Sequence, residues 1–147
     1  MKSVRAALNR RAKGEKGFTL VELLVVVIII GILAAVAVPI YLNQRKSAWN
    51  STIESDVKNA SLVVETAMTA NNGKFDSGWA KTYKEGKTTL GSSDQEITVS
   101  KGVEITISAN AGDGNAYTIK GHDDNTGTKV YTYDSSLGSM SADNKKK

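Results

Sequence analysis

A long apolar segment near the N-terminus constrains this chain more than any other feature of its sequence. Almost every residue from Phe18 to Leu42 is apolar, and the main exceptions are Thr19, Glu22, Gly31 and Pro39. A helix of that length crosses the hydrocarbon core of a bilayer, which is about 30 Å thick. An ordinary secretory signal has a shorter apolar region followed by a small-residue cleavage site. The segment is therefore predicted to be a transmembrane helix that the mature protein keeps.

The positive charge of the chain is concentrated before this segment. Residues 1–17 contain six Lys or Arg and one acidic residue, a formal charge of +5. The whole chain carries +4, so the remaining residues sum to −1. The cationic flank places the N-terminus in the cytoplasm. Because the body of the chain lacks a basic patch interleaved with aromatic residues, no specific nucleic-acid partner is predicted.

An amphipathic pattern follows the apolar segment. Apolar residues recur at steps of three and four from Trp49 to Met68, as on one face of a helix. Nothing interrupts the helical pattern between the two segments, so one continuous helix is predicted, ending near residues 71–73. Residues 73–94 are rich in Gly, Ser, Thr and Lys and are predicted to form a loop.

Four short strands are predicted between about residues 95 and 134, where apolar and polar residues alternate. Their apolar positions are Ile97 and Val99, Val103 to Ile107, Tyr117 and Ile119, and Val130 to Tyr133. A sheet with one apolar face needs a cover, and the amphipathic helix supplies it. The predicted fold class is α+β, with a long N-terminal helix packed on a small antiparallel four-stranded β-sheet. Residues 43–147 form its globular domain, and a flexible tail is expected from Asp143 to Lys147.

A specific motif marks the beginning of the apolar segment. The heptapeptide from Lys16 to Glu22 reads KGFTLVE, and the apolar run continues from it to Leu42. This stretch strongly resembles the processing site of type IV prepilins and pseudopilins. The family pattern has glycine before the cut, usually phenylalanine after it, and glutamate at the fifth mature position. Gly17, Phe18 and Glu22 fill these places.

The resemblance implies a pathway from the membrane to a filament. A prepilin peptidase and methyltransferase is expected to remove residues 1–17 as a leader, by cutting between Gly17 and Phe18, and to N-methylate Phe18. The precursor is then a single-pass protein of the cytoplasmic membrane. A pilus assembly ATPase and a platform membrane protein are expected to assemble the processed chains into a homopolymer, an extracellular surface filament. Neither catalytic residues nor a cofactor or metal is implied, so the chain is not expected to be an enzyme.

The resemblance also assigns Thr19 and Glu22 to assembly and register. Glu22 of an incoming subunit would pair with the Phe18 ammonium group of a subunit already in the filament, and the pair would fix the axial register. A charge in the middle of a bilayer costs about 3 kcal/mol, so it is usually functional. Alternatively, Glu22 lies near the cytoplasmic interface, where it reaches the headgroups and favours the helix N-terminus.

Gly31 and Pro39 have two interpretations that carry equal weight. In the first, Gly31 allows close contact between helices and Pro39 kinks the helix by removing one hydrogen bond. In the second, which follows the resemblance, the stretch between them loses helical hydrogen bonding in the filament and lengthens under load. Both depend on the same weakened turn.

Three functions remain open. The chain is a structural subunit of a type IV pilus, with the major pilin favoured, or a pseudopilin of a type II secretion or DNA-uptake (competence) machine. A membrane-anchored enzyme or binding domain would leave the motif unexplained. An acidic group, His122 to Asp124 with Asp134 nearby, suits strand turns better than a calcium site, because its spacing matches no EF-hand loop.

Cysteine is absent from the chain. This excludes a disulfide framework, a thiolate metal site and a cysteine nucleophile. Many pilins close their C-terminal region with a disulfide, so this chain departs from the common pattern. Its C-terminal end is therefore expected to be held by strand pairing.

Overall fold

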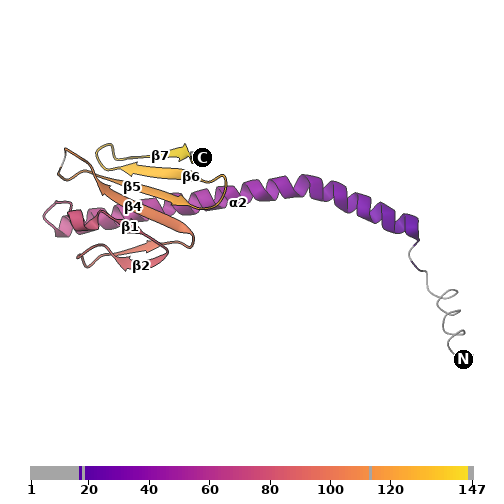
Figure 1. Cartoon of the computed structure of the whole chain (residues 1–147), viewed down its shortest axis with the longest axis horizontal. Helices are drawn as coiled ribbons and strands as arrows, with labels where there is room; N and C mark the ends of the chain where they lie inside the picture. The colour runs from indigo at the N-terminus through magenta and orange to yellow at the C-terminus, as the bar shows by residue number, and fades with distance from the viewer. Residues whose placement is uncertain (1–16, 18, 113, 146–147) are drawn as a thin grey trace, which may run out of the picture. The chain divides into compact units, whose positions relative to one another are not determined.

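The computed structural model (Figure 1) describes Gly17, residues 19–112 and residues 114–145. The chain divides into two compact units, and the boundary falls between Leu42 and Asn43. Helix α2, Leu20–Ala70, contributes its first part to the N-terminal unit and its remainder to the C-terminal unit. The prediction of one continuous helix is confirmed. Asn72 follows it with a φ of 55°, a left-handed conformation typical of a helix end, and Gly73 N–H donates to Met68 O at 2.8 Å.

The N-terminal unit is helical from Leu20 to Leu42, and the side chains of this stretch are exposed. Among the described residues, α2 is the one helix that is long and apolar enough to cross a membrane. Pro39 lies inside the helix. Since proline has no N–H, the carbonyl of Ala35 lacks its usual helical donor.

The C-terminal unit contains a five-stranded antiparallel sheet in the order β1-β4-β5-β6-β7. The strands of this sheet are β1 Thr82–Tyr83, β4 Val103–Ala109, β5 Tyr117–Asp123, β6 Lys129–Asp134 and β7 Ser139–Asn144. A separate antiparallel pair consists of β2 Gly86–Thr89 and β3 Glu96–Val99. A short 3₁₀ helix, η1 Ser77–Trp79, follows α2.

The predicted sheet needs three corrections. It has five strands and not four, and β3 pairs with β2 outside it. The predicted loop 73–94 contains η1, β1 and β2. Strand β2 was not predicted because all four of its side chains are exposed, so its sequence lacks an apolar alternation. The predicted flexible tail was wrong at Asp143 and Asn144, which belong to β7. Lys146 and Lys147 lie outside the described residues.

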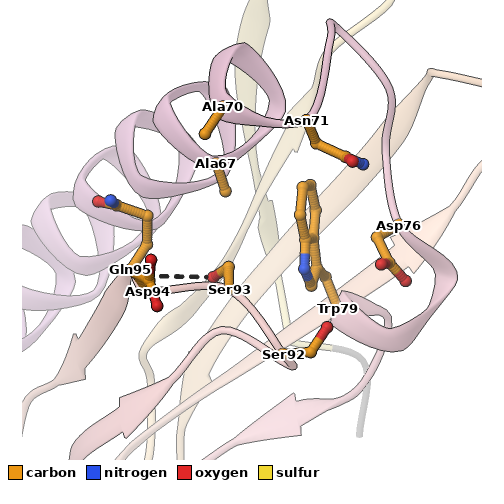
Figure 2. A pocket seen from close by; sticks show the side chains of 9 residues that line it. All are labelled: Ala67, Ala70, Asn71, Asp76, Trp79, Ser92, Ser93, Asp94 and Gln95. Atoms are coloured by element: carbon orange, nitrogen blue, oxygen red, sulfur yellow. Dashed lines mark hydrogen bonds between the residues drawn. The ribbon is translucent and has the colours of Figure 1, made fainter.

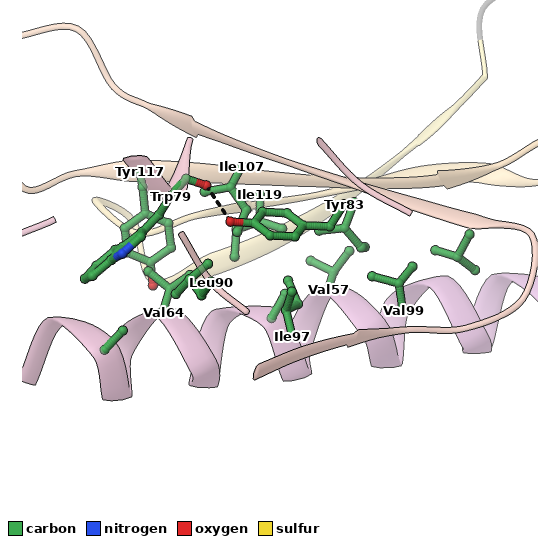
Figure 3. Close-up of a cluster of buried hydrophobic side chains, with 14 of the residues drawn as sticks. Val57, Val64, Trp79, Tyr83, Leu90, Ile97, Val99, Ile107, Tyr117 and Ile119 are labelled. Carbon is green, nitrogen blue, oxygen red and sulfur yellow. Dashed lines mark hydrogen bonds between the residues drawn. The ribbon is translucent and has the colours of Figure 1, made fainter. Parts of the chain in front are cut away.

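The core of the C-terminal unit lies between α2 and the two sheets. Helix α2 buries Ile53, Val57, Ala60, Val64 and Ala67, which follow one another at steps of four and three. Figure 3 shows Val57 and Val64 directed toward apolar side chains of the strands. The buried strand residues are Tyr83, Ile97, Val99, Val103, Ile105, Ile107, Tyr117 and Ile119. The predicted role of the amphipathic helix as a cover is confirmed.

Polar contacts fix the position of α2 in this unit. The buried carboxylate of Asp56 accepts hydrogen bonds from the N–H and hydroxyl groups of Ser100, at 2.7 and 2.9 Å. Tyr117 Oη donates to Glu65 Oε1 at 2.6 Å. Near the beginning of the unit, the Lys129 N–H donates to Asn50 Oδ1 at 2.8 Å.

The C-terminal end of the described chain is held by β7. This strand pairs with β6 along its whole length, from Asp134 opposite Ser139 to Lys129 opposite Asn144. Beyond the strand, Lys145 Nζ donates to the carbonyl of Asp123 at 2.6 Å. Strand pairing therefore closes this region, as expected for a chain without cysteine, and a side-chain contact reinforces it.

Candidate functional site

The beginning of α2 carries the residues that the sequence singles out for processing and assembly. Thr19 caps this end of the helix, because Glu22 N–H donates to Thr19 Oγ1 at 3.1 Å and Leu23 N–H donates to the Thr19 carbonyl at 3.1 Å. The resemblance alone assigned Thr19 to this site. Its Thr-x-x-Glu spacing with Glu22 is also a helix-start signal, which explains the observed cap.

Glu22 lies in the first turn of α2 and is exposed. An acidic side chain in this position interacts favourably with the helix dipole and the unpaired N–H groups of the first turn. Among the described residues, no basic side chain forms an ion pair with its carboxylate. The carboxylate is therefore available to a partner outside the described part of the chain.

Gly17 is exposed, and a Cβ atom built on it would meet nothing within 4 Å. The packing of the described chain therefore does not require glycine here, although a peptidase that approaches the backbone closely would. Phe18, the expected new N-terminus and methylation site, lies outside the described residues, as do residues 1–16 of the expected leader.

Gly31 and Pro39 lie in continuous helix. A Cβ atom on Gly31 would also meet nothing within 4 Å, so the described chain gives this glycine no packing partner. Pro39 removes one hydrogen bond from the same stretch. Both residues thus lower the intrinsic stability of the same helix, at positions eight residues apart.

The exposed apolar surface of the N-terminal unit is the second part of the candidate site. Leu23, Val26, Ile30 and Val36 are between 46% and 61% exposed, and their neighbours on the other sides of the helix are exposed as well. A helix that is apolar all round is stable when lipid or protein surrounds it. This surface can therefore bind a membrane or the equivalent helices of other subunits.

Asp123 and Asp134, two members of the acidic group that the sequence singles out, stabilise turns. Asp123 is buried and accepts hydrogen bonds from Asn125 N–H at 2.7 Å and Thr128 Oγ1 at 3.0 Å. Hydrogen bonds from the side chain and backbone of Ser136 lower the pKa of Asp134. His122 Nε2 lies 3.9 Å from Glu104 Oε1. In the part of the chain that the structure describes, no three such residues are placed to hold a metal ion.

Comparisons with known proteins extend beyond the helix. Residues 12–38 match the family model described as the prokaryotic N-terminal methylation motif. A fimbrial protein of Pseudomonas aeruginosa is 33% identical over 121 residues, which cover 74% of this chain and 76% of that protein. The type IV major fimbrial protein FimA of Dichelobacter nodosus is 38% identical over 87 residues, which cover 57% of this chain and 54% of that protein. No solved structure matches the chain significantly.

Proposed function

The chain belongs to the type IV pilin family, and on this premise we propose that it is the major subunit of a type IV pilus. The family makes it a structural protein that polymerises with other pilin subunits into surface fimbriae, and not an enzyme. The similarity to a protein named as a major fimbrial protein supports the choice of the major subunit.

Processing is proposed to cut the chain between Gly17 and Phe18 and to methylate the new amine of Phe18. The observation that supports this most directly is the match of residues 12–38 to the methylation motif, a range that includes both residues.

Polymerisation is proposed to bury the exposed apolar surface of residues 20–42 between subunits. The gain over a bilayer is small, since lipid is as apolar as the helix interface. Removing the helix from the membrane therefore needs an energy source, which a pilus assembly ATPase acting through a platform membrane protein would supply. The carboxylate of Glu22 would pair with the Phe18 amine of a neighbouring subunit and set the axial register, while Thr19 holds the first turn of the helix.

The first experiment is to measure, by mass spectrometry, the N-terminal peptide of protein sheared off the cell surface. We expect a peptide that begins with N-methylated Phe18. A peptide beginning at Met1, or no protein in the sheared fraction, would overturn the proposal.

A pair of glycine variants tests the cut site. Gly17→Val is expected to leave an uncleaved membrane protein and no filaments, because the branched side chain obstructs the backbone at the scissile bond. Gly14→Val, in the expected leader but away from the cut, is the matched control and should be processed. Normal processing of Gly17→Val would contradict the assignment.

Glu22→Ala tests the register role separately from processing. The variant should be cleaved but should yield few filaments, whereas Glu96→Ala, which removes an exposed carboxylate of β3, should assemble normally. A normal filament yield from Glu22→Ala would count against the pairing.

Electron microscopy of cells with the unaltered chain distinguishes a major pilin from a pseudopilin of a secretion or DNA-uptake machine. A pseudopilin would give short assemblies and no long surface pili.

A further inference from the structure

Three basic side chains lie at the end of the C-terminal unit where its part of α2 begins. Arg45 and Lys46 come three and four residues after Leu42, the last residue of the apolar segment. Lys129 is the first residue of β6, and its N–H donates to Asn50 Oδ1 at 2.8 Å, so β6 begins against the same part of α2. We propose that these three basic residues bind the phosphate groups of anionic phospholipids at the outer surface of the cytoplasmic membrane. The inference rests on the membrane-anchored precursor proposed above.

The spacing of Arg45 and Lys46 from the apolar segment matches the headgroup layer of a bilayer. The hydrocarbon core is about 30 Å thick and the whole bilayer about 40–45 Å, so each headgroup layer is about 5–8 Å thick. At 1.5 Å per residue, three and four residues of helix span about 5–6 Å. Both side chains therefore reach the headgroup layer when the apolar segment fills the hydrocarbon core. Because basic residues usually collect on the cytoplasmic side of a membrane helix, insertion alone does not account for two of them on the outer side.

Lys46 is half-buried against the turn between β5 and β6. A Cβ atom built on Gly127 would lie 3.0 Å from Lys46 Cε and 3.2 Å from its Nζ, and Gly127 has a φ of +82°. Glycine thus lets the turn pack closely against the side chain, which restrains the ammonium group before a ligand arrives. Among the described residues, no carboxylate forms an ion pair with Lys46 or Lys129. Both charges can therefore interact with an anion outside the described chain.

The chemistry of this surface suits an anionic headgroup at a membrane interface. Arg45 is exposed, and its guanidinium group lies 4.8 Å from the centroid of the Trp49 ring. A guanidinium group can stack on an aromatic ring and also bind a phosphate through its N–H groups, and tryptophan is enriched at membrane interfaces. Asp124 is the exposed carboxylate that follows β5, and it lies 3.9 Å from Lys145 Nζ, which offsets its charge. The surface therefore favours a lipid with net negative charge over a zwitterionic one.

The test follows the indole N–H signals of the two tryptophans by ¹⁵N–¹H NMR of the full chain in dodecyl maltoside, a detergent without phosphate. Trp49 reports on the surface through its contact with Arg45. Trp79 is the internal reference, because it is 2% exposed and lies among residues at the end of α2 and residues 92–95 (Figure 2). Dihexanoyl phosphatidylglycerol should shift the Trp49 signal saturably and leave the Trp79 signal unchanged. Dihexanoyl phosphatidylcholine, which has a phosphate but no net charge, should bind on the order of tenfold more weakly.

Lysine variants make the result specific to this surface. Lys46→Gln and Lys129→Gln leave the contact of Arg45 with Trp49 in place, and each should weaken the binding of phosphatidylglycerol about fivefold. Lys58→Gln is the matched control, because it removes an exposed cation about three turns farther along α2. This control should bind as the unaltered chain does.

Inorganic phosphate distinguishes a lipid from a free ion, and at the same concentration it should leave the Trp49 signal in place. An equal shift with inorganic phosphate would assign the surface to a soluble anion and overturn the proposal. Binding of phosphatidylcholine as tight as that of phosphatidylglycerol, or unchanged affinity in both lysine variants, would also overturn it. A Trp49 shift that follows protein concentration and not lipid would assign the surface to contacts between copies of the chain. None of these outcomes depends on the cut site or on whether the chain is a major pilin.

Discussion

Asp56 shows how one buried charge connects two parts of the fold. Its side chain lies on the same face of α2 as Ile53 and Ala60, at steps of three and four, and is buried with them. The carboxylate holds the turn between β3 and β4 through its two hydrogen bonds with Ser100. A buried charge is tolerated only where such partners are present.

Replacement of Asp56 by alanine is expected to destabilise the C-terminal unit by about 1–3 kcal/mol, because it leaves the Ser100 donors without an acceptor. Urea unfolding followed by near-UV circular dichroism measures the change. Ser100→Ala should remove less stability, and the double variant should lose less than the sum of the two single losses. Strict additivity would show that the two side chains do not interact.

Gly121 allows a close approach between β5 and α2. A Cβ atom at this position would lie 2.4 Å from Val57 Cγ2 and 3.0 Å from Ile105 Cδ1. Real Cβ atoms do not approach other atoms so closely, so a side chain here forces the helix or its neighbours to move.

Gly121→Ala is therefore expected to lower the free energy of unfolding by about 1–3 kcal/mol, the usual effect of overpacking a core. The control is Gly114→Ala, since a Cβ atom on Gly114 meets nothing within 4 Å. Thermal unfolding should distinguish the two variants. Equal melting temperatures would mean that the core accommodates the methyl group by a small shift of Val57.

At the scale of elements, periodicity in the sequence predicted the parts that depend on apolar side chains. The part of α2 from Ile53 to Ala67 and strands β3, β4 and β5 follow repeats that burial in the core of the C-terminal unit imposes. Strands β1, β2 and β7 were missed, β1 because it has only two residues, and β2 and β7 because backbone pairing with a neighbouring strand needs no apolar alternation. β7 has the sequence SMSADN, in which only Met140 is partly buried, so its pairing with β6 leaves no pattern to detect.

The stretch from Gly31 to Pro39 is the weakest part of the N-terminal helix by composition. Pro39→Ala should restore the hydrogen bond to the Ala35 carbonyl and stabilise the helix by up to about 3 kcal/mol, whereas Gly31→Ala should add about 1 kcal/mol. Amide hydrogen exchange of residues 31–43 in micelles measures both effects. Unchanged exchange in Pro39→Ala would show that the proline does not weaken this turn.

At the scale of the whole molecule, buried tyrosines make stability depend on alkaline pH. Burial raises the pKa of Tyr117, and its hydrogen bond to the Glu65 carboxylate raises that pKa further. Burial also raises the pKa of Tyr83 and of Tyr131. The folded chain therefore keeps these protons at a pH where the unfolded chain, with tyrosine pKa values near 10, releases them.

The stabilising effect is complete below pH ~10 and is lost as the pH rises from there toward the folded-state pKa values. Tyr117 alone should contribute a decline of up to about 1.4 kcal/mol for each pH unit in this range. Unfolding in urea at several pH values tests this. Tyr117→Phe should reduce the slope of the free energy of unfolding against pH, whatever its effect on stability at neutral pH. An unchanged slope would mean that other groups cause the pH dependence.

The candidate site and the polar contacts of the globular unit differ in how far the sequence could predict them. The residues from Gly17 to Glu22 that are proposed to act in processing and assembly lie in one linear segment, so a resemblance could find them. The contacts between Asp56 and Ser100 join segments that come together only in the folded C-terminal unit, and no spacing in the sequence marks them. The Thr19 cap is intermediate between these cases. The Thr-x-x-Glu spacing is visible in the sequence, whereas the hydrogen bond from Glu22 N–H to Thr19 Oγ1 is seen only in the structure.

The closure of the C-terminal region by β7 also determines the conditions under which the protein can fold. Strand pairing, the packing of Met140 against the core and the contacts of Lys145 with Asp123 and Asp124 hold this end of the described chain. No oxidant, thiol exchange or oxidative-folding catalyst is therefore needed to complete the sheet. The globular unit should refold from denaturant equally well with and without dithiothreitol, and a reducing environment should leave it intact.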